Sequence, residues 1–319
     1  MKWLAPLLLI SFGYVLFGLF LGFQEVSGYL SRIGWMWWLA CIGAVLLGHC
    51  LLWLRWHVDL RLLGHPLQWK DSLRIYVCGL SLIMAPARGG ETLRGIWLRK
   101  LHAIPIQIGV GITLSERLLD LASALLILAW GLGEKILPAV MISALIGALG
   151  AWLLTHPRAI RWLDQQPLLR LFPCKTPRLH KIFREMLNAM STLRKLIKPI
   201  PLLFGLLMSI GAWMLESVML LNIFRVIGVN LELTQVASIR TVSSIAGVFS
   251  FLPAGIGTSE VSSIGLAMFF GSSRAQAFTA TLIIRACTVL IPFIIGATLL
   301  ALNPELYRKH PNERDHFDL

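Results

Sequence analysis

Charged residues are scarce in this sequence: Asp, Glu, Lys and Arg make up 14% of its 319 residues, against about 25% in a typical soluble domain. Hydrophobic residues account for 56% of the chain, and the mean hydropathy is +0.73. A soluble fold of this composition would expose large apolar patches to water. The composition therefore excludes a soluble enzyme, a secreted disulfide scaffold and a disordered binder, and it indicates an integral membrane protein.

Cysteine motifs and nucleotide-binding motifs are also missing. The five cysteines include no C-x-x-C pair, which argues against disulfides and a zinc site. The sequence lacks the motifs G-x-x-x-x-G-K-[ST], H-E-x-x-H and G-x-S-x-G. We therefore expect no metal, no cofactor and no ATP-driven transport by this chain alone. The net charge of +13 does not predict nucleic-acid binding, because Lys and Arg positions report topology in a membrane protein.

Long apolar segments define the predicted membrane domain, residues 1–302, which a short tail at 303–319 follows. Six segments are long enough to span a bilayer: 3–23, 35–54, 106–132, 136–155, 200–224 and 276–301. We interpret the first as a retained transmembrane helix rather than a cleaved signal peptide, because its apolar run is long and no A-x-A site follows.

Two further apolar stretches, 72–102 and 236–271, are each interrupted by proline and glycine. Such broken backbone is tolerated at membrane depth only where it is buried in protein or lines a wet cavity. The predicted fold is therefore an all-α polytopic membrane protein with six transmembrane helices plus two re-entrant helical hairpins. Two kinked ordinary helices are the alternative. The residues that break the hairpins are Pro86, Gly89, Gly90, Pro253, Gly255 and Gly257.

The distribution of Lys and Arg predicts the orientation. With a cytoplasmic N-terminus, 21 of these residues fall in cytoplasmic segments and five in external ones, which satisfies the positive-inside rule. Both termini and the basic loop 156–198 are then cytoplasmic. Within this loop, 178–198 has helical apolar spacing. Two interpretations are equally supported: an amphipathic helix on the anionic inner leaflet, and a helix that caps the bundle.

The two interrupted stretches belong to an internal repeat with halves at about 35–132 and 200–301. The order Gly64, Ser72-Leu-Arg74, Pro86, Glu91, Arg117 recurs as Gly228, Ser238-Ile-Arg240, Pro253, Glu260, Arg285, and the helices before it end alike, at Arg55 and Arg225. Three predicted spans separate the hairpins, and an odd number reverses the second hairpin. The prediction is an inverted-topology repeat, an arrangement that places transporter sites near the midplane.

Several ionisable residues fall at predicted membrane depth, where each costs at least ~2.5–3.5 kcal/mol. The repeat predicts that Glu91 lies near Arg117 and Glu260 near Arg285, while Arg117 can pair with Asp120. We interpret the set as a hydrated cavity that binds a lipid headgroup. The arginines would bind phosphate, and the carboxylates would bind an amine or carry protons. Alternatively, the charges only satisfy one another. The predicted headgroup-binding residues are Arg88, Glu91, Glu116, Arg117, Asp120, Glu260 and Arg285.

Three segments together resemble a known family: PARGGE at 86–91 with Arg94, ERLLD at 116–120, and SIAGVFSFLPAGIGTSE at 244–260. They are similar to the lysylphosphatidylglycerol synthase transmembrane-region family, the flippase-like half of the multiple peptide resistance factors. The resemblance covers nearly the whole chain and implies translocation of aminoacylated or other anionic lipids. It also implies a bacterial inner-membrane location. The family's aminoacyl-transferase domain is not expected here, because 17 mostly polar residues follow Leu302.

The leading functional prediction is a non-enzymatic lipid translocase for an anionic or aminoacylated phospholipid or a related lipid carrier. A non-transporting accessory protein for a lipid or envelope-glycan enzyme is the first alternative. The second is an intramembrane transferase with Glu116 and Asp120 as acid and base. The expected partners are membrane phospholipid and the anionic inner leaflet, through 178–198. A second copy of the chain and a lipid-synthesising enzyme are candidate protein partners.

Overall fold

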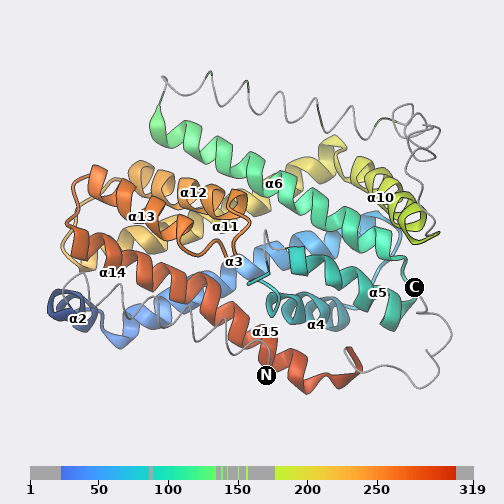
Figure 1. Cartoon of the computed structure of the whole chain (residues 1–319), viewed down its shortest axis with the longest axis horizontal. Helices are drawn as coiled ribbons and strands as arrows, with labels where there is room; N and C mark the ends of the chain where they lie inside the picture. The colour runs from blue at the N-terminus through green and yellow to red at the C-terminus, as the bar shows by residue number, and fades with distance from the viewer. Residues whose placement is uncertain are drawn as a thin grey trace.

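The computed structural model describes residues 23–85, 89–133 and 177–306, with isolated residues at 138, 142, 150 and 156. These residues form helices and turns, without a strand, as the all-α prediction requires (Figure 1). The α-helices are α2 (Phe23–Ser31), α3 (Trp35–Leu62), α4 (Trp69–Leu80), α5 (Arg94–His102), α6 (Ile106–Leu132), α10 (Pro177–Leu196), α11 (Pro199–Val226), α12 (Leu233–Phe249), α13 (Thr258–Phe269), α14 (Arg274–Arg285) and α15 (Ile291–Leu302). Three short helices accompany them: η1 (Gly89–Leu93) before α5, the π-helix η2 (Ala286–Leu290) between α14 and α15, and η3 (Pro304–Leu306) after α15.

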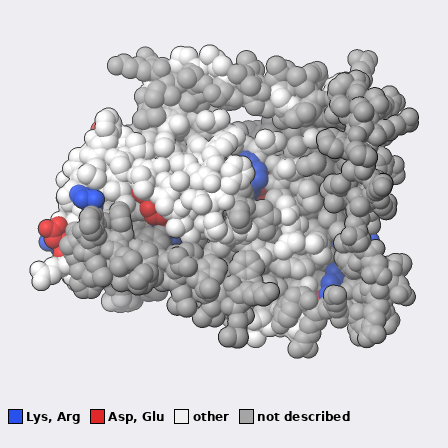
Figure 2. Space-filling view, viewed as in Figure 1, with Lys and Arg blue, Asp and Glu red and all other residues white. Residues whose placement is uncertain are grey.

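Three continuous helices are long and apolar enough to cross a membrane: α3, α11, and the run α14–η2–α15 from Arg274 to Leu302. They coincide with the predicted spans at 35–54, 200–224 and 276–301. Helix α6 has 27 residues, which is also long enough to span, but it carries three charged residues in its middle. On the face in Figure 2, the described residues are mostly uncharged. The predicted spans 3–23 and 136–155 lie outside the described residues, isolated positions excepted.

The first helix of each half ends in the same hydrogen-bonded turn. Gly64 after α3 and Gly228 after α11 both have φ +84°. Their N–H groups donate to the carbonyls of Arg61 and Arg225, and the next residues, His65 and Val229, donate five residues back. This Schellman turn needs a left-handed residue, which glycine supplies without strain. Each glycine is followed four residues later by the N-cap of the next helix, Gln68 and Glu232.

Each half then continues as helix, break and helix, an order that fits both predicted alternatives, re-entrant hairpins and kinked helices. The first break joins α4 to η1 and α5, and Gly89 and Gly90 begin η1; Pro86 and Arg88 lie outside the described residues. The second break joins α12 to α13 after Pro253. Gly255 and Gly257 have φ +65° and +88° there, values that favour glycine over other residues.

The two halves pack on each other reciprocally (Figure 1). Helix α3 lies antiparallel to α11, with Gly48 beside Ala212 and Arg55 bonded to Ser209. Helix α6 of the first half packs on α12 of the second, and α15 of the second half packs on α4 of the first. Two equivalent units related by a two-fold axis make contacts of this kind, so the packing supports the predicted duplication.

Parts of the predicted repeat alignment are wrong. Helix α3 does not end at Arg55 but continues to Leu62, so Arg61 is the residue that corresponds to Arg225. Arg74 lies six residues after the N-cap of α4, whereas Arg240 lies eight after the N-cap of α12. Two residues turn a helix by about 200°, so these side chains face different surroundings. Arg74 pairs with Glu305 at 2.7 Å near the surface, and Arg240 points inward.

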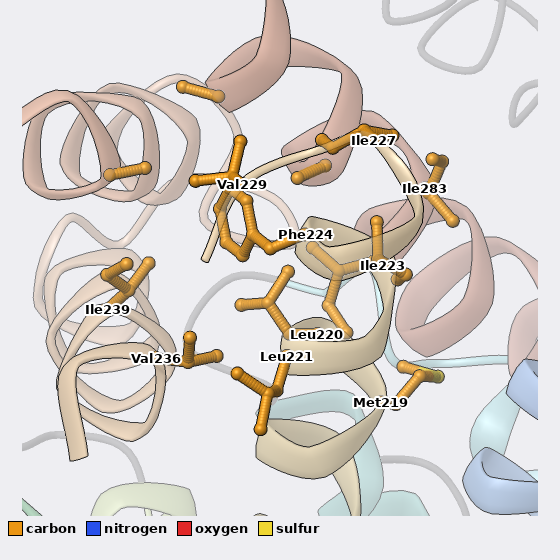
Figure 3. Close-up of a cluster of buried hydrophobic side chains, with 14 of the residues drawn as sticks. Met219, Leu220, Leu221, Ile223, Phe224, Ile227, Val229, Val236, Ile239 and Ile283 are labelled. Atoms are coloured by element: carbon orange, nitrogen blue, oxygen red, sulfur yellow. The ribbon is translucent and has the colours of Figure 1, made fainter. Parts of the chain in front are cut away.

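Each half has its own apolar core. In the second half, side chains from α11, α12 and α14 interdigitate, among them Leu220, Phe224, Ile239 and Ile283 (Figure 3). In the first half, the core forms around Trp56 of α3 with residues from α4, α5 and α6. Because well-packed cores resist deformation, they fix the positions of the helices that carry the charged side chains.

The described part of α10 packs its apolar side against protein. Leu187, Ala189 and Leu193 are buried, and Thr192 lies against Gly111 of α6. Over these residues the helix therefore caps the bundle, which was one of the two interpretations of 178–198. Contact of this segment with an anionic leaflet stays a prediction.

Candidate functional site

A dense ion-pair cluster occupies the first half, and Arg94 is its centre. One nitrogen of its guanidinium, Nη2, lies 2.7 Å from Glu91 Oε2 and 2.8 Å from Glu116 Oε2. The guanidinium also lies over the rings of Trp56 and Tyr76, at 4.7 Å and 5.3 Å from their centroids. Because Arg94 is only 2% exposed, it holds η1, α5 and α6 together through a buried, charge-assisted contact.

Arg55 joins the same cluster from α3. Its Nη1 lies 2.9 Å from Asp120 Oδ1, and it also donates to Ser209 of α11. Its second amino nitrogen lies 3.9 Å from Glu116 Oε1. The headgroup-binding residues predicted from the sequence did not include Arg55 or Arg94, yet both side chains are buried beside the carboxylates of that set.

Arg117 forms the outer edge of this cluster, and its predicted ion pairs are present. Its Nη2 lies 3.0 Å from Glu91 Oε2 and 3.3 Å from Asp120 Oδ2. At 28% exposure, Arg117 is far more accessible than Arg94. The guanidinium is therefore positioned to contact a ligand on its open side.

In the second half, the predicted pair of Glu260 and Arg285 is also present. Arg285 Nε lies 2.7 Å from Glu260 Oε1, and its Nη2 donates to the carbonyl of Ala254 at 2.7 Å. Glu260 Oε2 accepts the N–H of Gly257 at 2.7 Å, which caps the start of α13. The pair thus fixes the shape of the second break as well as its charge.

Sequence reasoning missed a further ion pair, between Arg240 of α12 and Glu216 of α11. The guanidinium of Arg240 lies 5.3 Å from the centroid of the Trp213 ring and also contacts Ser244. Arg240 was not among the headgroup-binding residues predicted from the sequence. The presence of Glu216 in the middle of an apolar helix could have predicted this ion pair, because a carboxylate at membrane depth is almost always paired.

A cavity of about 350 Å³ lies where the two halves meet. Arg117 and Asp120 enter it from α6, Arg240 from α12, and Arg285 from the end of α14. Ala85, next to the first break, and Gly255, in the second, both line it, so the two breaks approach the same space. The remaining wall is mainly apolar and includes Leu118, Leu121, Trp213, Val248, Phe249 and Leu252. The cavity combines three arginines with a largely hydrophobic lining.

This arrangement suits an amphiphilic anion better than a metal ion. Converging guanidinium groups bind phosphate through charge-assisted hydrogen bonds. Phe249 and Leu252 of the wall are also exposed at the molecular surface, at 63% and 44%. Apolar chains attached to a bound headgroup would find suitable contacts there. No group of three metal-ligating side chains occurs among the residues that the structure describes.

Comparison with known proteins identifies relatives of the whole membrane domain. A family model described as the lysylphosphatidylglycerol synthase TM region matches residues 3–296. A UPF0104 membrane protein of Methanothermobacter thermautotrophicus is 26% identical over 267 residues, which is 76% of each chain. A second UPF0104 membrane protein, from Methanocaldococcus jannaschii, is 21% identical over 276 residues, 80% of this chain and 81% of the relative. No solved structure matches this chain significantly.

Proposed function

The chain belongs to the family of the lysylphosphatidylglycerol synthase transmembrane region and is a multi-pass membrane protein, and we propose that it translocates lipid headgroups through the central cavity. The observation that carries this proposal is the convergence of Arg117, Arg240 and Arg285 on one cavity with apolar walls. The substrate is an anionic or aminoacylated phospholipid or a related lipid carrier, and the chain acts without enzymatic chemistry.

The energetic role of the cavity follows from the cost of moving a phosphate through hydrocarbon. An unpaired charge at membrane depth costs several kcal/mol, because it loses its hydration. Guanidinium groups compensate part of this loss, while the lipid chains stay outside, along the exposed apolar wall near Phe249 and Leu252. A volume of about 350 Å³ suits a headgroup rather than a whole lipid.

The membrane arrangement is part of the same proposal. The two breaks are the tips of re-entrant hairpins that enter from opposite sides, in an inverted-topology repeat. The antiparallel pairing of α3 with α11 and the reciprocal packing of α6 and α15 support this arrangement. The excess of Lys and Arg in the segments assigned to the inside supports cytoplasmic termini. The bacterial inner membrane is the location that the family resemblance implies. The two relatives named above come from archaea.

One observation favours a second candidate, a non-transporting accessory protein. The charges of the first half pair with each other in a buried cluster, with Arg94 and Arg55 almost fully covered. A cluster of this kind can lock a fold without binding a ligand. Transport activity separates the two candidates.

The test is reconstitution of the purified protein in liposomes that contain phospholipids with a fluorescent acyl chain. Wild type should accelerate exchange between leaflets, and Arg285→Ala or Arg117→Ala should slow it, by about tenfold for each ~1.4 kcal/mol of lost stabilisation. Arg74→Ala is the matched control, because this arginine pairs with Glu305 away from the cavity. If folded wild type moves no phospholipid or polyprenyl phosphate, with or without a proton gradient, the accessory role replaces translocation.

A further inference from the structure

The ion pairs in and around the cavity are balanced in charge. Among the described residues, five arginines and five carboxylates take part: Arg55, Arg94, Arg117, Arg240 and Arg285 with Glu91, Glu116, Asp120, Glu216 and Glu260. A headgroup that brought a phosphate alone would add one negative charge that the arginines of this described set do not already offset. A headgroup that also carried an ammonium group would keep the balance.

The pairs differ in how readily they can open for such a headgroup. Glu91, Glu116 and Asp120 each contact two arginines, and Glu260 both pairs with Arg285 and caps α13. Glu216 pairs with one arginine among the described residues, and its side chain is 23% exposed, more than any of the other four carboxylates. The pair of Glu216 with Arg240 is therefore the easiest to exchange for contacts with a ligand.

The surroundings of Arg240 allow this exchange. Its guanidinium lies over the ring of Trp213, which keeps it in place without a carboxylate, and both residues line the cavity. Arg285 lines the same cavity of about 350 Å³ as Arg240, so a phosphate in that cavity can approach both arginines.

Resting on the proposed function, we infer that the translocated lipid has a zwitterionic headgroup with one phosphodiester and one primary amine. Arg240 binds the phosphate and Glu216 binds the ammonium group, so the two residues exchange their mutual ion pair for two pairs with the ligand. Arg285 supplies the second phosphate contact. Glu216 and Arg240 are therefore the residues that set headgroup specificity.

The experiment compares two acyl-labelled lipids with unmodified headgroups, phosphatidylethanolamine and phosphatidylglycerol, in liposomes that contain the purified protein. Wild type should move the ethanolamine lipid at least about tenfold faster, a ratio that corresponds to ~1.4 kcal/mol. Glu216→Gln should lower this ratio by slowing the ethanolamine lipid and accelerating the glycerol lipid, because the site gains one positive charge. Glu216→Asp, which keeps the charge, should retain the preference.

Glu305→Gln is the matched control, because it removes one carboxylate from the exposed pair with Arg74 and should leave the ratio unchanged. Equal rates for both lipids, or faster movement of the glycerol lipid, would overturn the zwitterion inference while translocation stands. An unchanged ratio in folded Glu216→Gln would remove Glu216 from the specificity site. Movement of neither lipid by folded wild type would contradict translocation of these lipids itself, which is the proposed function rather than its specificity.

Discussion

The two halves have the same order of helices, but their ion pairs are arranged differently. Each half has a glutamate at the start of a short helix and an arginine about one span later, and each glutamate pairs with its arginine: Glu91 with Arg117 and Glu260 with Arg285. In the first half this pair belongs to a cluster in which most charges have two partners. In the second half it is one of two separate pairs beside the cavity. The charges of the first half therefore form one shared network, whereas those of the second half form two separate pairs.

Individual substitutions between the halves explain the difference. Three residues after the glutamate, the first half has Arg94 and the second has Ser263, which hydrogen-bonds Thr281 at 2.9 Å. One residue before the arginine, the first half has Glu116 and the second has Ile284. Three residues after it, Asp120 corresponds to Thr288. The second half thus keeps the pair of Glu260 with Arg285 and replaces the rest of the cluster by neutral residues, and Arg285 lines the cavity.

The largest loss of stability is expected from Arg94→Ala, which removes the central arginine of the buried ion-pair cluster in the first half. The change leaves Glu91 and Glu116 without their shared buried cation and removes the contacts with Trp56 and Tyr76. We expect a loss of about 3–5 kcal/mol in the free energy of unfolding, measured by thermal denaturation in detergent. Arg94→Lys should rescue little, because one ammonium group cannot reproduce the planar, stacked guanidinium. Near-wild-type stability of Arg94→Ala would show that the ion-pair cluster does not stabilise the first half.

A smaller effect is expected at the break of the second half. Gly255 has φ +65°, and a Cβ added there would lie 2.5 Å from Gly247 Cα. Gly255→Ala should therefore cost about 2–4 kcal/mol through backbone strain and overpacking. Gly257→Ala is the control: it also has positive φ, but its Cβ would meet open space, so only the strain of ~1–2 kcal/mol applies. Equal melting temperatures for the two variants would contradict the close packing of this break.

Arg285→Ala should cost less than Arg94→Ala, because its carboxylate partner keeps another contact. Glu260 still accepts the N–H of Gly257, and the pair is partly exposed. We expect a loss of ~1–3 kcal/mol, and the double variant Arg285→Ala with Glu260→Ala should recover part of it. If Arg285→Ala destabilises the protein as much as Arg94→Ala, the separate ion pair of the second half contributes as much stability as the shared network of the first.

The smallest effect is expected for Glu305→Gln, which removes the exposed partner of Arg74 at the end of the chain's last described helix. Exposed ion pairs contribute about 0.2–1 kcal/mol, so the melting temperature should change little, and less in high salt. This variant provides the baseline against which the buried pairs are measured. A loss as large as that of Arg285→Ala would indicate that burial does not govern these ion pairs.

Sequence reasoning found the features that depend on spacing and missed those that depend on packing. The end of α11 near Arg225 and the two breaks could be predicted from glycine and proline, and the repeat spacing was sufficient to pair Glu91 with Arg117. The end of α3 could not, because its apolar run stops at Arg55 while the helix continues to Leu62. Arg55, Arg94 and Arg240 were left out of the predicted site, because hydropathy treats an arginine at a helix end or hairpin arm as interfacial. Their burial depends on carboxylates contributed by other helices, which no local pattern reveals.

The most direct test of the central claim is to locate a bound headgroup by photocrosslinking. A phospholipid with a diazirine on its headgroup, reconstituted with wild-type protein, should label residues of the cavity wall such as Leu121 and Trp213. A diazirine on the acyl chain should instead label the exposed wall near Phe249 and Leu252. Arg240→Ala with Arg285→Ala should reduce the headgroup labelling while acyl-chain labelling persists. Headgroup labelling confined to the helix ends, and unchanged by these substitutions, would contradict a headgroup site between the two halves.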